Sequence, residues 1–133
     1  LWPALQASTE QFRRRGDTAL DYVNELPGLA LDADRQAQVF HIVQEALSNI
    51  ARHARAHHAW LHIGRDPAGG VQVQVADDGA GLPPESGDGG SHYGLAIMRE
   101  RAQRLGGDLQ VVPREGGGTV VRLQFPLPPG VAA

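Results

Sequence analysis

Residues 71–81 read Val-Gln-Val-Gln-Val-Ala-Asp-Asp-Gly-Ala-Gly, and this stretch defines one strand and the turn that follows it. Apolar and polar residues alternate along its first half, which is typical of a strand with one buried face. Asp77 at the strand end can accept a hydrogen bond from an amino group, and Gly79 and Gly81 let the backbone pass close to a flat or phosphorylated ligand. A simple turn that closes the strand can have the same sequence, so this stretch alone leaves both interpretations open.

The rest of the chain places helical and strand patterns around this strand. We expect helices at about 1–16, 34–54 and 94–105, and strands at about 18–24, 58–63, 71–75, 109–112 and 119–125. Asp34 is expected to cap the long helix. This order predicts an α/β (α+β) two-layer sandwich, in which helices cover one face of a mixed, mostly antiparallel sheet. We expect a single domain over 1–133, with an N-terminal helix at about 1–16 and a core at about 17–127.

Composition excludes several classes of enzyme and partner. The 133 residues include no Cys, which excludes disulfides, thiolate metal sites and a cysteine nucleophile. All 12 basic residues are Arg, so a Walker A loop and a catalytic lysine are excluded as well. The formal charge of -3 attracts neither nucleic acid nor an anionic membrane, and no stretch approaches the roughly 18 apolar residues of a membrane span. We therefore expect no nucleic-acid partner and no direct membrane contact.

Three polar side chains border the apolar side of the long helix. At about 100° per residue, Glu45, Asn49 and Arg52 fall within a sector about 60° wide, beside the stripe expected to face the core. A carboxylate, a carboxamide and a guanidinium group side by side can form part of a polar site. A solvated helix side with an ordinary pair between Glu45 and Arg52 has the same pattern, so the helix alone leaves both possibilities open.

Two glycine-rich stretches follow further along the chain. Residues 87–94, Gly-Asp-Gly-Gly-Ser-His-Tyr-Gly, run directly into the helix expected at 94–105, and amides at a helix N-terminus form a natural phosphate site. Residues 116–119, Gly-Gly-Gly-Thr, precede the last strand. A surface loop without a ligand and a plain hairpin turn are the respective alternatives.

The order of these features resembles one known family. Glu-x-x-x-Asn on a helix, Asp-x-Gly-x-Gly after a hairpin strand, a glycine-rich lid before a helix, and Gly-Thr before the last strand resemble the ATP-binding domain of sensor histidine kinases. This is the Bergerat-type nucleotide fold, shared with gyrase, Hsp90 and MutL, and the resemblance covers about 18–126. Residues 44–49 (Gln-Glu-Ala-Leu-Ser-Asn) and 92–102 look most like the NarL-type subfamily, which is similar to the nitrate/nitrite sensor kinases.

The resemblance implies a role for each matching residue. Asn49 matches the helix Asn that binds the Mg²⁺ bridging the nucleotide phosphates, and Glu45 matches an acidic residue with an auxiliary polar role in catalysis. Asp77 matches the carboxylate that accepts a hydrogen bond from the adenine amino group. Guanine presents a carbonyl there, which favours ATP over GTP. Gly79 and Gly81 match the glycines that let the backbone run close to the nucleotide base.

The lid and its helix match the phosphate side of the family's site. Tyr93, Gly94 and Leu95 match the junction whose backbone amides meet the phosphates, after a lid at about 82–93. This lid is short, lacks the Phe-rich segment of many larger sensor kinases, and has His-Tyr-Gly in place of a first Gly-x-Gly motif.

Three further residues match polar positions around the nucleotide. Thr119 matches the hydroxyl that supports the adenine-binding carboxylate, often through water. Arg52 and His53 match a basic residue followed by His or Tyr, and we expect them near the phosphates or the ribose.

The resemblance also implies partners outside this chain. In the family, this domain presents the γ-phosphate of Mg-ATP to a histidine on a helical dimerisation domain, and a response regulator, here of the NarL type, then receives it. None of the histidines has the acidic-flanked helical context of a phosphoacceptor, and the chain begins inside a helix without Met. We therefore expect a cytoplasmic fragment of an inner-membrane sensor that binds ATP without phosphorylating itself, with nitrate or nitrite as its implied signal.

Two alternatives belong to other functional classes. A serine kinase of the anti-sigma-factor kind has the same fold and needs no histidine stem. A non-catalytic docking module with a degenerate nucleotide fold is the other. The joint presence of Asn49, Asp77, Gly79 and Gly81 argues against the second alternative, because a docking module has no chemical need for this set.

Overall fold

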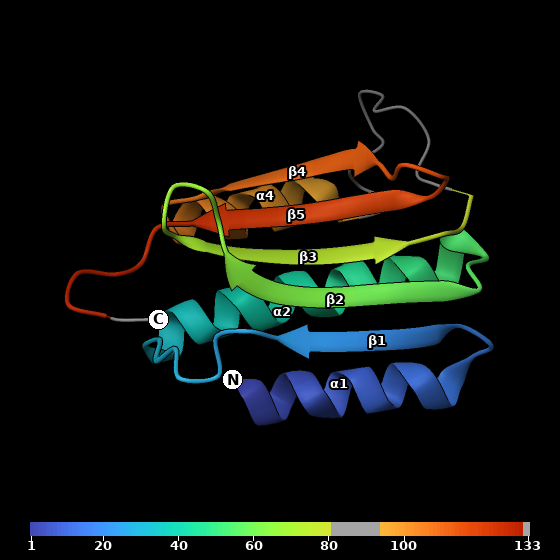
Figure 1. Ribbon diagram of the computed structural model, residues 1–133, viewed down its shortest axis with the longest axis horizontal. Helices are drawn as coiled ribbons and strands as arrows, with labels where there is room; N and C mark the ends of the chain where they lie inside the picture. Colours follow the sequence, from blue (N-terminus) through green and yellow to red (C-terminus); the bar gives the residue numbers. More distant parts are fainter. Residues whose placement is uncertain (81–93, 132–133) are drawn as a thin grey trace.

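The alternating apolar residues of five segments form one sheet. The structure is a computed structural model, and it describes residues 1–80 and 94–131. The strands follow one another across the sheet in the order β1-β2-β3-β5-β4 (Figure 1). Their bounds are β1 Ala19–Asn24, β2 His58–Arg65, β3 Val71–Asp77, β4 Asp108–Pro113 and β5 Thr119–Phe125.

The pairing of the strands is mixed, as predicted. β1 runs parallel to β2, with Ala19 opposite His58, whereas the pairs β2·β3, β3·β5 and β4·β5 are antiparallel. The register between β3 and β5 places Asp77 directly opposite Thr119. Two residues of the predicted site therefore meet at one end of the sheet because of strand pairing alone.

In residues 1–80 and 94–131, three helices supply the second layer. They are α1 (Trp2–Arg15), α2 (Ala33–Asn49) and α4 (Leu95–Arg104). In Figure 1, α2 and α4 lie behind the sheet while α1 runs alongside β1. Contacts of α2 with both α1 and α4 place it in the middle of the layer. The buried apolar residues of helices and strands form one cluster, so the predicted two-layer fold with helices on one face is confirmed.

The long helix differs from its prediction at both ends. Asp32, not Asp34, caps it, because the Asp32 carboxylate accepts a hydrogen bond of 2.8 Å from the Arg35 amide. At the other end, α2 ends at Asn49, and a π-helical turn over Ile50–Ala54 continues it. Single π-helical turns often mark functional sites, and this one directly follows a predicted site residue.

Other boundaries agree closely with the sequence patterns. Gly94 precedes α4 in the left-handed conformation, with φ of 67°, and Gly106 follows it with φ of 75°. Glycine adopts both conformations without the clash that a side chain would cause. The predicted lid at about 82–93 lies outside the described residues, as do Gly81 and Tyr93.

Candidate functional site

A small cavity lies where α2 ends over the sheet. Three polar residues that the sequence singled out line it, namely Asn49, Asp77 and Thr119, with exposed fractions of only 5%, 5% and 6%. The apolar part of the lining comes from Ala46, Ile50, Ala54, Val75 and Val121. About 20 Å³ of the cavity is open to a water-sized sphere, which is room for about one water molecule.

Asp77 is a buried carboxylate with a defined orientation. The Gly79 amide donates a hydrogen bond of 2.8 Å to its Oδ1 atom. Burial raises the pKa of Asp77 above the ordinary value of 3.8, while the hydrogen bond from Gly79 opposes that increase. The side chain is thus a buried acceptor at the cavity wall.

Two glycines permit the close backbone approaches around Asp77. At Gly118, φ is 103°, and an added Cβ would lie 1.8 Å from the Asp77 carbonyl oxygen. At Gly79, a Cβ would lie 2.0 Å from the carbonyl oxygen of Ala54, which also accepts a hydrogen bond of 2.7 Å from the Ala80 amide. The Asp-x-Gly turn is therefore fastened to the π-helical turn, and Gly79 contacts protein backbone there.

Polar side chains of α2 and of the π-helical turn that continues it form a second cluster next to this cavity. The Arg52 Nη2 atom lies 3.5 Å from Glu45 Oε1 and 3.3 Å from Asn49 Oδ1. Arg52 Nε also donates a longer hydrogen bond of 3.4 Å to the Ser48 carbonyl. The ion pair between Glu45 and Arg52, which the sequence left open as the alternative to a polar site, is present. Asn49 belongs both to this cluster and to the cavity.

The start of α4 meets this cluster at Glu45. An added Cβ at Gly94 would lie 2.4 Å from Glu45 Oε1, so the close contact depends on glycine. Leu95 is buried, with 5% exposed, and its side chain belongs to the core. The N-terminus of α4, with its backbone amides, is thus held beside the polar face of α2.

Three predicted site residues belong neither to the cavity nor to the polar cluster as described. His53 is exposed on the π-helical turn and is not among the residues that line the cavity. Gly81 and Tyr93 fall in the stretch 81–93, outside the described residues.

Asp78 serves a structural purpose, unlike its neighbour. Its Oδ1 atom accepts two hydrogen bonds of 2.9 Å, from the amides of His57 and His58. These bonds lower the pKa of Asp78 below its ordinary value. The apolar–polar alternation along β3 places Asp77 on the buried face. This alternation is a sequence signal that distinguishes the role of Asp77 from that of Asp78.

Two residues contribute to the site through their backbone, and the sequence patterns did not indicate the contact that either one makes. Ala54 supplies the carbonyl that fixes the Asp-x-Gly turn, but an alanine near a helix end has no distinguishing feature. Gly118 belongs to a run of three glycines that a hairpin turn explains equally well.

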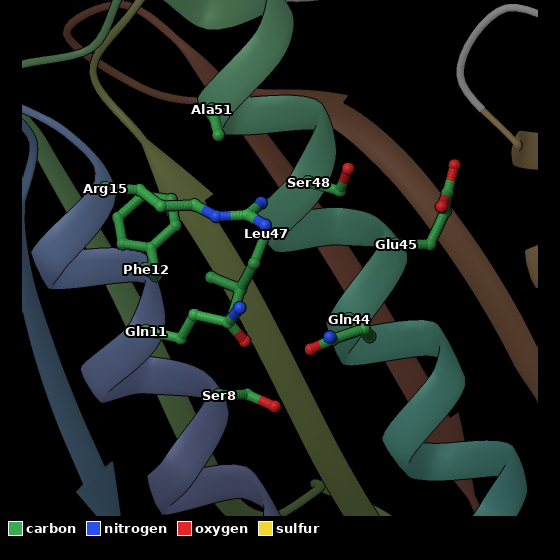
Figure 2. A pocket seen from close by; sticks show the side chains of 9 residues that line it. All are labelled: Ser8, Gln11, Phe12, Arg15, Gln44, Glu45, Leu47, Ser48 and Ala51. Atoms are coloured by element: carbon green, nitrogen blue, oxygen red, sulfur yellow. The ribbon is translucent and has the colours of Figure 1, made fainter.

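A separate groove runs between α1 and α2 (Figure 2). About 180 Å³ of it is open to a water-sized sphere. Its lining residues come from α1, α2 and the start of the π-helical turn: Ser8, Gln11, Phe12, Arg15, Gln44, Glu45, Leu47, Ser48 and Ala51. Among the described residues that were assigned a role at the predicted site, Glu45 lines this groove.

The described residues contain neither a cluster of metal-binding side chains nor a membrane-spanning helix. In residues 1–80 and 94–131, no three His, Cys, Asp or Glu side chains gather in a way that could hold a metal ion. The helices in these ranges lack the length and the apolar composition that a membrane span requires.

A carboxylate, a carboxamide and a hydroxyl therefore surround one cavity between the helical layer and the sheet. Residues 34–129 match the family model described as histidine kinase-, DNA gyrase B-, and HSP90-like ATPase. The chain belongs to this family, which confirms the resemblance predicted from its motifs.

Curated relatives narrow the likeness to sensor kinases. The nitrate/nitrite sensor protein NarQ of Escherichia coli K12 is 38% identical over 123 residues, which are 92% of this chain and 21% of NarQ. The nitrate/nitrite sensor protein NarX of the same organism is 35% identical over 125 residues, 94% of this chain and 21% of NarX. The sensor histidine kinase LiaS of Bacillus subtilis is 31% identical over 90% of this chain and 32% of LiaS. The chain thus spans about a fifth of the length of NarQ and NarX.

Solved structures share the fold. The blue-light activated histidine kinase of Erythrobacter litoralis EL346 superposes with a TM-score of 0.73 at 24% identity, over 92% of this chain and 40% of that one. The ATP-binding domain of PrrB from Mycobacterium tuberculosis superposes with a TM-score of 0.70 at 21% identity, over 95% of this chain and 93% of that one. These likenesses confirm the predicted fold class.

Proposed function

We propose that this chain binds Mg-ATP as the catalytic domain of a sensor histidine kinase and presents the γ-phosphate to a histidine on another domain. The observation that carries this proposal is the meeting of Asn49, Asp77 and Thr119 at one cavity beside the Glu45–Arg52 pair. Strand register and the end of α2 bring these residues together from three distant parts of the chain.

At the base end of the site, Asp77 accepts a hydrogen bond from the adenine amino group. Its Oδ1 atom is held by the Gly79 amide, which fixes the carboxylate in place. The cavity has room for about one water molecule, which suits a water shared by Asp77 and Thr119, so these residues form a floor for the edge of the base. Guanine would place its carbonyl against Asp77 and leave two acceptors facing each other, which discriminates against GTP.

At the phosphate end, two oxygen atoms fit a divalent cation. Glu45 Oε1 and Asn49 Oδ1 both lie within 3.5 Å of one positively charged nitrogen, Arg52 Nη2, so they converge on a point that already favours positive charge. Hard oxygen ligands of this kind suit Mg²⁺, which retains most of its water and phosphate ligands. When bound there, Mg²⁺ neutralises phosphate charge. Asn49 would be the ligand, with Glu45 as an auxiliary polar group.

Other residues of the chain complete the proposed phosphate contacts. Gly94 and Leu95 present backbone amides at the start of α4, and Tyr93 directly precedes them. Arg52 and His53 follow Asn49 on the π-helical turn, where their positive charge or ring nitrogens can reach phosphate or ribose. Their task is to position the nucleotide, which is the main protein contribution in phosphoryl transfer.

The partners of the whole protein follow from its relatives. NarQ and NarX are named as nitrate/nitrite sensors, which supports a phosphoacceptor histidine on a dimerisation domain outside this chain and a NarL-type response regulator. We place this domain on the cytoplasmic side of an inner-membrane sensor, with nitrate or nitrite as its signal. LiaS is named as a sensor histidine kinase, which favours the histidine kinase over a serine kinase.

Calorimetric titration of the 133-residue chain tests the proposal. ATP should bind, more tightly with Mg²⁺ than without it, while GTP should bind at least about tenfold more weakly. Incubation with labelled ATP should leave no phosphate on the chain itself. The absence of ATP binding at millimolar concentration would contradict the proposal and favour the docking module.

A further inference from the structure

Arg52 occupies the position where the two oxygen atoms of the proposed cation site converge. A single nitrogen, Nη2, makes both contacts, at 3.5 Å to Glu45 Oε1 and 3.3 Å to Asn49 Oδ1. The third contact of this side chain, from Nε to the Ser48 carbonyl, is long at 3.4 Å. The guanidinium group therefore supplies positive charge where a divalent cation would otherwise supply it.

Arg52 and a divalent cation are expected to exclude one another at this position. Both need the Asn49 Oδ1 atom, and two positive charges a few ångströms apart repel each other. Asn49 is 5% exposed and belongs to a packed helix, so it has little freedom to serve both. One of the two cations must leave Asn49 when the other arrives.

The guanidinium group is the one that can leave. Its side chain is 52% exposed, and that of Glu45 is 36% exposed, so water competes strongly for this ion pair. The long, flexible Arg side chain also regains rotamer freedom when it is released. A phosphate group next to the site offers it a better partner, because Arg binds phosphate oxygens through several N–H donors at once.

We propose that Arg52 is a stand-in cation, which holds Glu45 and Asn49 in the nucleotide-free chain and gives up Asn49 to the divalent cation that arrives with ATP. This inference rests on the proposed function, because it concerns the same site. Arg52 therefore has two opposite effects: it competes with the divalent cation, and it stabilises bound nucleotide when no divalent cation is present.

Cation binding without nucleotide tests the competition. Mn²⁺ is added to the 133-residue chain, and paramagnetic broadening of the Asn49 side-chain amide signal in NMR spectra reports its binding. The Arg52→Gln variant should bind Mn²⁺ about fivefold more tightly at Asn49 than the wild type, since an exposed ion pair is worth up to about that factor. Equal or weaker broadening in the variant would overturn the inference.

Arg104→Gln is the matched control. Arg104 Nη2 forms a pair of 3.2 Å with Glu100 on α4, and the two side chains are 57% and 63% exposed. This variant loses the same charge and a comparable ion pair away from the cavity. It should leave the broadening at Asn49 as in the wild type, and Arg52→Lys, which keeps the charge, should lie closer to the wild type than Arg52→Gln.

Nucleotide affinity provides the second readout. The ratio of the ATP Kd without Mg²⁺ to that with Mg²⁺ should be about fivefold larger in Arg52→Gln than in the wild type, because the variant lacks the substitute cation. If Arg52 only binds phosphate, both Kd values rise by one factor, the ratio stays constant, and the inference fails. A wild-type chain that binds no ATP would instead contradict the proposed function.

Discussion

The two ends of the proposed site are built in different ways. At the base end, Asp77 and Thr119 are 5% and 6% exposed, and strand register and glycine contacts hold them in place. At the cation end, the side chains of Glu45 and Arg52 are 36% and 52% exposed and meet along one helix. The base end is thus fixed by backbone packing, whereas the cation end can exchange its contacts. Substitutions that disturb backbone packing at the base end should therefore abolish adenine recognition. Substitutions that change a charge at the cation end should alter the affinity for the divalent cation.

The largest effect is expected where packing is tightest. At Gly118, a Cβ would lie 1.8 Å from the Asp77 carbonyl oxygen, and φ is 103°. Gly118→Ala should lower the free energy of unfolding by about 3 kcal/mol or more and abolish ATP binding. Gly117→Ala is the matched control, because its φ is 112° but no atom lies within 4 Å of the added Cβ. This control should cost about 1 kcal/mol, and denaturant titration measures both variants. Similar losses in the two would mean that the base end is not tightly packed.

The next largest effect is expected from Asp77→Asn. Its side-chain amide can still accept from Gly79 but presents a donor to the adenine amino group, so ATP should bind ten- to a hundredfold more weakly, about 1–3 kcal/mol. Calorimetry measures this loss. Unchanged affinity would remove Asp77 from base recognition.

Asp77→Asn should not lower the thermal stability of the chain, although it lowers the affinity for ATP. Because the pKa of Asp77 is raised in the folded chain, its contribution to stability falls as the pH rises from 3.8 through the raised value. The ionised carboxylate therefore opposes folding at neutral pH. Asp77→Asn should unfold at an equal or higher temperature at pH 7, and any advantage should shrink towards pH 3.8. A lower unfolding temperature at pH 7 would assign Asp77 to structure.

Asp78→Asn should have the opposite pattern. The two amides of His57 and His58 lower the pKa of Asp78 in the folded chain, so the stability it contributes is present above 3.8 and is lost as the pH falls through the lowered value. The variant should unfold at a lower temperature at pH 7, with the difference closing in acid, while ATP affinity stays that of the wild type. A loss of affinity as large as that of Asp77→Asn would break the distinction between these neighbours.

The smallest effect is expected from Thr119→Val. Valine keeps the shape of the buried side chain opposite Asp77 but removes the hydroxyl, so ATP affinity should fall only about threefold. Competition with a fluorescent nucleotide measures this difference. A loss that equals that of Asp77→Asn would make Thr119 a direct ligand of the base.

Much of the fold could be predicted because hydrophobic periodicity reports burial directly. Valines at every second position define β3, and the 3.6-residue pattern of α2 places Glu45, Asn49 and Arg52 beside the core. The Asp-x-Gly turn predicted a backbone that passes close to a ligand. Its partner at Gly79 is the Ala54 carbonyl, which no local pattern indicates.

What could not be predicted depends on three-dimensional context. Two acidic residues near the start of α2 can each cap it, and only the path of the chain decides for Asp32 over Asp34. The change from α-helix to π-helix after Asn49 has no sequence signal of its own, yet the π-helical turn carries the Ala54 carbonyl that accepts a hydrogen bond from the Ala80 amide. Gly118 acquires its importance from strand register, which places it against Asp77.

The most direct measurement is a set of two-dimensional ¹H–¹⁵N NMR spectra of this chain with adenosine, ATP and Mg-ATP. We predict that the amide signals of Asp77, Gly79 and Thr119 shift with all three ligands, because all three carry the base. The Asn49 side-chain amide should show its largest change only when Mg²⁺ is present. Shifts confined to the α1–α2 groove, at residues such as Gln44, with no change at Asp77, would contradict the account.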